Sequence, residues 1–132
     1  MQVVHGRGYV YAMEYHIVWC TKYRRKVLDD KVAAILSGEL EKYAQENGFT
    51  IGEKEIMPDH IHLLISASPQ VFIPDIMKGM KGVSARMVFK ARPELKDKLW
   101  KGHLWNPSYF VATISEHTGE QIRHYINSQK ER

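Results

Sequence analysis

The chain has 132 residues, 44% of them hydrophobic and 26% charged, which suits a single globular domain covering residues 1–132. Its single cysteine, Cys20, excludes an intramolecular disulfide, and no apolar run approaches the ~18 residues of a membrane helix, so a cytoplasmic protein without membrane partners is expected. The formal net charge of +4 permits a nucleic-acid partner but does not require one.

Hydrophobic periodicity predicts four strands and three helices. In chain order they are a strand, a helix, two strands, a helix, a strand and a last helix, over residues 11–20, 30–47, 49–57, 60–67, 74–91, 109–114 and from Thr118 onward. Asp29 or Asp30 can cap the first helix and Gly48 can end it, while residues 92–106 predict a loop. The order β-α-β-β-α-β plus a C-terminal helix predicts an α+β fold, a ferredoxin-like sandwich with an antiparallel sheet.

The spacing of side chains also assigns faces to these elements. In the strand over residues 60–67, Ile61, Leu63 and Ile65 are expected to point into the core. For the helix over residues 74–91, the expected core positions are Ile76, Met80, Val83 and Met87. Thr118 and Gln121 form a capping-box pattern at the start of the last helix. Gly119 beside them is either a hinge or ordinary turn punctuation.

Two histidines form the first candidate site. His60 and His62 are separated by one residue in a strand, so their imidazoles share the face opposite the apolar one. Neutral imidazole is a common ligand of divalent metals, and the amide oxygen of Gln129 on the last helix can supply a third ligand. An open site of mixed nitrogen and oxygen ligands suits a cation that polarises a phosphate. The alternative is one hydrogen-bonded core histidine and one surface histidine.

Tyr125 is the candidate nucleophile, four residues before Gln129 and therefore on the same side of the predicted helix. A phenol with a pKa near 10 is a poor nucleophile, but a metal that neutralises a phosphate makes attack feasible. Attack on DNA would form a phosphotyrosine, whose phosphodiester bond conserves the energy of the broken DNA bond for the rejoining step. The absence of a Walker-type loop agrees with this, so no nucleotide cofactor is expected. The alternative is a tyrosine that only packs on the sheet.

Basic residues around aromatic rings form a candidate DNA surface. Cations alternate with a tyrosine after the first strand, at Lys22, Tyr23, Arg24 and Arg25. This pattern is typical of single-strand binding, although it could be a solvated charge run. Three cations on the second helix, Lys78, Lys81 and Arg86, could hold phosphates or only face water. The remaining histidines lack paired spacing and are expected to be structural or on the surface, namely His5, His16, His103, His117 and His124.

Several of these stretches occur together, and in the same order, in a known family. They are residues 15–25 (YHIVWCTKYRR), 57–64 (MPDHIHLL) and 81–86 (KGVSAR), then Leu104-Trp105 with residues 108–111 (SYFV), and finally Tyr125 with Gln129. In this respect the chain resembles the single-tyrosine HUH transposases of insertion sequences that move as single-stranded DNA.

The resemblance implies a function and a site. His60 and His62 would bind Mg²⁺ or Mn²⁺ with Gln129 as third ligand, and Tyr125 would cut one strand and stay on its 5′ phosphate. The enzyme would act as a homodimer on single-stranded DNA with hairpins at the element ends. The alternative is a non-catalytic, domesticated hairpin-binding module on the same fold. A third option is a relative that nicks and rejoins DNA in replication or housekeeping transposition.

Overall fold

The structure is a computed structural model that describes residues 4–6, 9–11, 13–98, 102–113 and 118–129, with only the backbone described for the first two segments. Its main sheet has four antiparallel strands in the order β4-β5-β3-β6. These strands are β3 (Glu14–Cys20), β4 (Thr50–Met57), β5 (His60–Ser66) and β6 (Phe110–Thr113). The strands β3 and β5, each of which is followed by a helix, therefore lie in the middle, as the ferredoxin-like prediction requires.

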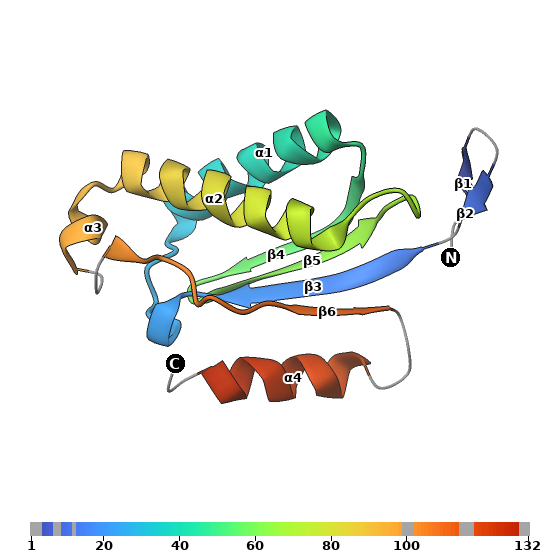
Figure 1. Ribbon diagram of the computed structural model, residues 1–132. Helices are drawn as coiled ribbons and strands as arrows, with labels where there is room; N and C mark the ends of the chain where they lie inside the picture. Colours follow the sequence, from blue (N-terminus) through green and yellow to red (C-terminus); the bar gives the residue numbers. More distant parts are fainter. Residues whose placement is uncertain (1–3, 7–8, 12, 99–101, 114–117, 130–132) are drawn as a thin grey trace.

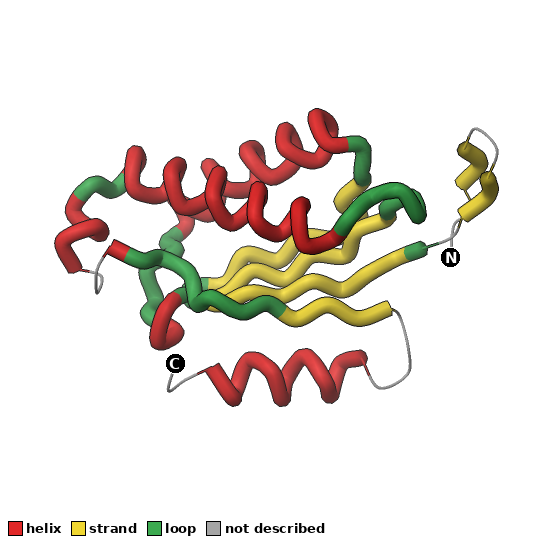
Figure 2. Tube along the Cα trace, viewed as in Figure 1, coloured by secondary structure: helices red, strands yellow, loops and turns green. Residues whose placement is uncertain are grey.

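The helices lie on both faces of this sheet (Figure 1). They are α1 (Asp30–Asn47), α2 (Ile73–Ala91), α3 (Glu94–Lys98) and α4 (Thr118–Ser128), and a short 3₁₀ turn, η1 (Lys22–Arg24), follows β3. Figure 2 shows α1 and α2 together over one face, while α4 runs along the other face beside β6. The α+β prediction with a C-terminal helix is confirmed.

The N-terminal end differs from the prediction of one strand over residues 11–20. Tyr9–Tyr11 is β2, which pairs with β1 (Val4–Gly6) in a separate two-stranded hairpin. β3 begins only at Glu14, whose partner Ser66 is the last residue of β5. Beyond this pair the carbonyl of Met13 accepts a hydrogen bond from the N–H of Ala67 at 3.2 Å, and among the described residues the pairing with β5 goes no further.

The helix α1 has the predicted bounds, and the structure decides between its two possible caps. Asp29 is the N-cap, and its carboxylate accepts a hydrogen bond from the Val32 N–H at 2.9 Å. Gly48 ends the helix in the left-handed region at φ 74°. Leu36 and Leu40 are fully buried against the sheet.

The second helix and the loop after it depart from the prediction in detail. Ile76 and Met80 are buried as expected, but Val83 and Met87 are only half-buried, and the fully buried stripe also includes Met77, Ser84 and Val88. Val83 and Tyr43 of α1 line the same pocket. The predicted loop after residue 91 contains the short helix α3, which follows Pro93. Gly119 lies inside α4, so it is not a turn glycine.

A glycine permits the close packing of α1 against α2. A Cβ atom at Gly79 would overlap the ring of Tyr43. We therefore expect Gly79→Ala to destabilise the protein by about 1–3 kcal/mol, because the ring or the helix must move. Urea unfolding measures this free energy.

Gly38 provides a matched control, because it is exposed within α1 and a Cβ atom added there would have no neighbouring atom within 4 Å. Gly38→Ala should stabilise the protein by about 0.5–1 kcal/mol through helix propensity alone. Equal effects of the two substitutions would show that Tyr43 does not contact Gly79.

Candidate active site on the α4 face of the sheet

The alternation predicted for β5 is observed. Ile61, Leu63 and Ile65 are fully buried beneath α1 and α2. His60 and His62 consequently share the opposite face, which is the face that α4 partly covers. In the register with β3, His60 lies opposite Cys20 and His62 opposite Val18.

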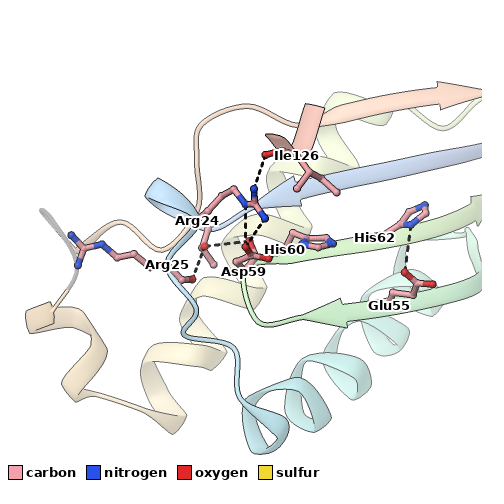
Figure 3. A network of polar contacts seen from close by, with 8 residues as sticks. Arg24, Arg25, Glu55, Asp59, His60, His62 and Ile126 are labelled. Carbon is pink, nitrogen blue, oxygen red and sulfur yellow. Dashed lines mark hydrogen bonds and ion pairs between the residues drawn. The ribbon is translucent and has the colours of Figure 1, made fainter. Parts of the chain in front are cut away.

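His60 is held by the Asp59 carboxylate, which in turn binds the guanidinium of Arg24 (Figure 3). Its Nδ1 lies 2.8 Å from Oδ1 of Asp59. Oδ2 of Asp59 accepts a hydrogen bond from Nε of Arg24 at 3.0 Å and forms an ion pair with NH2 of Arg24 at 2.9 Å. Burial alone would raise the pKa of the Asp59 carboxyl, but the hydrogen bond from His60 and the charge of Arg24 lower it below its ordinary value. With Nδ1 engaged by a carboxylate, the Nε2 lone pair of His60 is available to a ligand.

His62 has a different partner, which the sequence did not predict. Nδ1 of His16 lies 2.9 Å from Nε2 of His62, and Oε2 of Glu55 lies 3.9 Å from Nδ1 of His62. Burial lowers the pKa of His62, and the charge of His16 lowers it further, so the ring is neutral near neutral pH. The expectation that His16 is only structural or on the surface missed this contact. Strand alternation could have predicted the contact, because it puts His16 on the same face as Val18, whose partner in β5 is His62.

A short segment after α3 brings a serine to the same face. The N–H of Asn106 donates to the carbonyl of Cys20 at 2.9 Å, which fixes the segment at the end of β3. The ammonium of Lys81 donates to the carbonyls of Asn106 at 2.6 Å and Ser108 at 3.2 Å. Burial lowers the pKa of Lys81. Lys81, which was predicted to contact DNA, is therefore bonded within the protein. Its hydrogen bonds fix the segment that carries Ser108.

Ser108 joins the two predicted residues of α4. Its Oγ lies 2.8 Å from the Tyr125 hydroxyl, and it donates to Oε1 of Gln129 at 3.2 Å and to Oδ1 of Asn106 at 2.9 Å. The two amide oxygens can only accept, so the single Ser108 proton is shared between them and the phenol is the donor to Ser108. The ring of Tyr125 also packs on Phe110 of β6, with centroids 5.8 Å apart. Gln129 is 2% exposed.

The site thus consists of two groups of side chains. One is the histidine group on β5, and the other is the tyrosine group of Ser108, Tyr125 and Gln129. Arg24 connects them, because its NH1 lies 3.4 Å from the carbonyl oxygen of Ile126 in α4, next to Tyr125. For Gln129 and both histidines to share one cation as predicted, Oε1 of Gln129 must exchange its Ser108 contact for a metal contact, and Nε2 of His62 must exchange its His16 contact.

The side chains predicted to hold a metal, His60, His62 and Gln129, are of types that bind divalent cations. Within the described segments no group of three or more His, Cys, Asp or Glu side chains is suited to a metal ion. A cation held by only two imidazoles and an amide oxygen would have coordination positions left for phosphate oxygens. Cys20 lies on the same face, but burial raises the pKa of its thiol to about 11, so the thiol stays protonated and is a poor ligand.

The remaining predicted DNA contacts lie outside these two groups. Tyr23 is 41% exposed, and the Lys22 ammonium lies 5.2 Å from the centroid of its ring. Arg25 is exposed in the same turn, and Lys78 and Arg86 are exposed on α2. Arg24, in contrast, points inward, and its positive charge is paired with the Asp59 carboxylate.

Removal of the Ser108 hydroxyl tests how strongly it holds α4. Ser108→Ala leaves the buried Oε1 of Gln129 without its serine donor, so we expect the free energy of unfolding to fall by about 1–3 kcal/mol. Urea unfolding gives this value. Ser37→Ala in α1 is the control and should change stability by less than about 0.5 kcal/mol. A Ser108→Ala protein as stable as the control would mean that this hydroxyl does not anchor the helix.

Comparison with known proteins identifies the family. Residues 9–129 match the family described as IS200-like transposases. The ISDra2 transposase TnpA of Deinococcus radiodurans is 52% identical over 132 residues, which is all of this chain and 94% of that protein. The transposase for insertion sequence element IS200 of Salmonella typhimurium is 31% identical over 118 residues, covering 89% of this chain and 77% of that protein.

Solved structures agree with this result. A putative transposase from Deinococcus radiodurans R1 superposes with a TM-score of 0.90 at 53% identity, covering 96% of this chain and 97% of that one. A REP-associated tyrosine transposase bound to a REP hairpin superposes with a TM-score of 0.58 at 18% identity, covering 97% and 73%, and shares the fold. The chain belongs to the IS200-like transposase family, whose activity is DNA transposition. Across the described residues, no helix is both long and apolar enough to cross a membrane.

Proposed function

We propose that this transposase cuts and rejoins single-stranded DNA at hairpin-marked element ends through a 5′-phosphotyrosine at Tyr125. The observation that carries the proposal is the placement of Tyr125 on the helix that covers the face of the sheet bearing His60 and His62. The Tyr125 hydroxyl is held by Ser108 in a polar network that also contains Gln129, so the phenolic oxygen and the amide proposed as a metal ligand lie together.

The chemistry of the cleavage step follows from these groups. The phenolic oxygen of Tyr125 forms a bond to the phosphorus and releases its proton to water, while the Ser108 hydroxyl orients the phenol by accepting its hydrogen bond before the attack. The 3′ oxygen leaves and takes a proton, so a 3′ hydroxyl is released. Rejoining reverses these steps with another 3′ hydroxyl, and no nucleotide is consumed.

His60, His62 and Gln129 would hold the cation, for which we propose Mg²⁺ or Mn²⁺. The bound ion would neutralise the charge that develops on the phosphate. Because Nδ1 of His60 faces Asp59, the lone pair on Nε2 of His60 points away from that carboxylate. The lowered pKa of His62 favours the neutral ring that a metal binds. We further propose that the protein works as a homodimer on single-stranded DNA, with its tyrosine helix serving its own subunit or the other.

A labelled oligonucleotide tests the proposed intermediate. Single strands that carry the terminal hairpins flanking the gene are labelled at either the 3′ or the 5′ end and incubated with protein and Mn²⁺. We expect a covalent adduct on a denaturing gel only for the 3′ label, because the tyrosine keeps the downstream 5′ phosphate. Metal-independent hairpin binding without any adduct, over all terminal sequences, would favour the non-catalytic module. An adduct with the 5′ label would reverse the polarity of the mechanism.

The exposed cations Lys78 and Arg86 of α2 are proposed to contact the DNA backbone. Arg86→Ala should weaken hairpin binding uniformly across sequences and reduce the slope of log affinity against log salt by about one. Fluorescence anisotropy at several salt concentrations measures both quantities. Lys42, exposed on α1, is the control for a change of one positive charge. If Arg86→Ala and Lys42→Ala have the same slope, Arg86 is an ordinary surface residue.

A further inference from the structure

We infer that Arg24 is a positioning residue that couples the metal ligand His60, through Asp59, to the helix that carries Tyr125. The inference rests on the proposed function and assigns Arg24 a role inside the site instead of on the DNA surface. Its basis is the single guanidinium that contacts both the carboxylate behind His60 and the backbone of α4 (Figure 3).

The first contact prepares His60 for a metal. Two nitrogens of Arg24 bind one oxygen of Asp59, which leaves the other oxygen for Nδ1 of His60. Asp59 is 6% exposed, so its orientation is fixed by these partners and not by water. A histidine ligand whose second nitrogen is held by a carboxylate has a defined ring orientation and a more basic ligating nitrogen.

The second contact stabilises the end of α4. The carbonyl of Ile126 belongs to the last turn of the helix, where the final four carbonyls lack partners within the helix. That last turn contains no basic residue of its own. NH1 of Arg24 therefore supplies both a donor and the positive charge that favours a helix C-terminus.

The backbone around Arg24 supports a dedicated role. Tyr23 and Arg24 have φ values of 57° and 51°, in the left-handed region that non-glycine residues rarely adopt. The N–H of Arg24 donates to the carbonyl of Thr21 at 2.9 Å, which closes this turn. Strain of this kind persists where the surroundings fix the conformation, and here it directs the Arg24 side chain back between β5 and α4.

Hydrogen exchange with mass spectrometry, with and without Mn²⁺, tests the coupling. In the wild type, Mn²⁺ should slow amide exchange in α4. In Arg24→Ala, metal-free exchange of the last turn should rise about fivefold, and the effect of Mn²⁺ on α4 should disappear. Arg92→Ala removes an arginine–carboxylate pair with Asp29 on another part of the surface and should leave both values unchanged.

Two further variants keep the test decisive. If Arg24→Ala does not fold, Arg24→Lys keeps the charge but cannot contact Asp59 and Ile126 together, so the response to Mn²⁺ should again be lost. Asp59→Asn should weaken Mn²⁺ binding about 10–100-fold in calorimetry, independently of DNA cleavage. An Arg24→Ala protein whose α4 exchanges and responds to Mn²⁺ like the wild type would overturn the inference. A wild type that forms no adduct would instead refute the proposed function, while the metal-free exchange of α4 would still report on Arg24.

Discussion

The Tyr125→Phe variant should form no covalent adduct with hairpin DNA, and its rate of strand cleavage should fall on the order of 10³-fold or more. The substitution removes only the oxygen that attacks the phosphate. The ring keeps its packing on Phe110, and α4 keeps the Gln129 contact with Ser108. Quantification of the adduct on denaturing gels measures the effect.

The controls for this variant are hairpin affinity and stability. Both should remain near the wild-type values, apart from the loss of one hydrogen bond to Ser108, which is worth about 1 kcal/mol. Tyr109→Phe controls for the loss of a phenol elsewhere and should cleave normally. Undiminished cleavage by Tyr125→Phe would assign the nucleophile to another residue.

His60→Ala should lose at least 100-fold in Mn²⁺ affinity and should also lose cleavage. The substitution removes a proposed ligand and leaves the Asp59 carboxylate, which is buried beside Arg24, without its imidazole partner. Calorimetric titration with Mn²⁺ in the absence of DNA separates the binding defect from the catalytic one.

His103→Ala is the matched control, because His103 is exposed and lies outside both groups of site residues. It should bind Mn²⁺ like the wild type. If His60→Ala binds Mn²⁺ as tightly as His103→Ala, the histidine pair is not the metal site.

Periodicity was sufficient to predict most of the fold. The bounds of α1 and the buried face of β5 were predictable because local capping and strict alternation determine them. The start of β3 was not predictable, because it depends on where its partner β5 ends. The buried stripe of α2 was not predictable either, because it depends on how Tyr43 packs between the helices. The short helix α3 gave too few apolar repeats to be distinguished from a loop.

The candidate site likewise has a part that the sequence predicts and a part that it does not. The shared face of His60 and His62, and that of Tyr125 and Gln129, follow from the geometry of one strand and one helix. The contacts between residues far apart in sequence could not be predicted from such local geometry. His16 meets His62, Ser108 meets Tyr125, and Arg24 turns inward to Asp59 because of strand register and a left-handed turn that no local pattern specifies.

The most direct test of the account is the position of a bound metal relative to the nucleophile. Crystals of Tyr125→Phe with Mn²⁺ and a terminal hairpin oligonucleotide can be examined by anomalous scattering from manganese. We expect one anomalous peak bonded to nitrogens of His60 and His62, with the scissile phosphate on the metal and the ring of residue 125, from either subunit, beside that phosphate. A manganese site away from both histidines, or a ring at residue 125 that cannot reach the phosphate in any subunit, would contradict it.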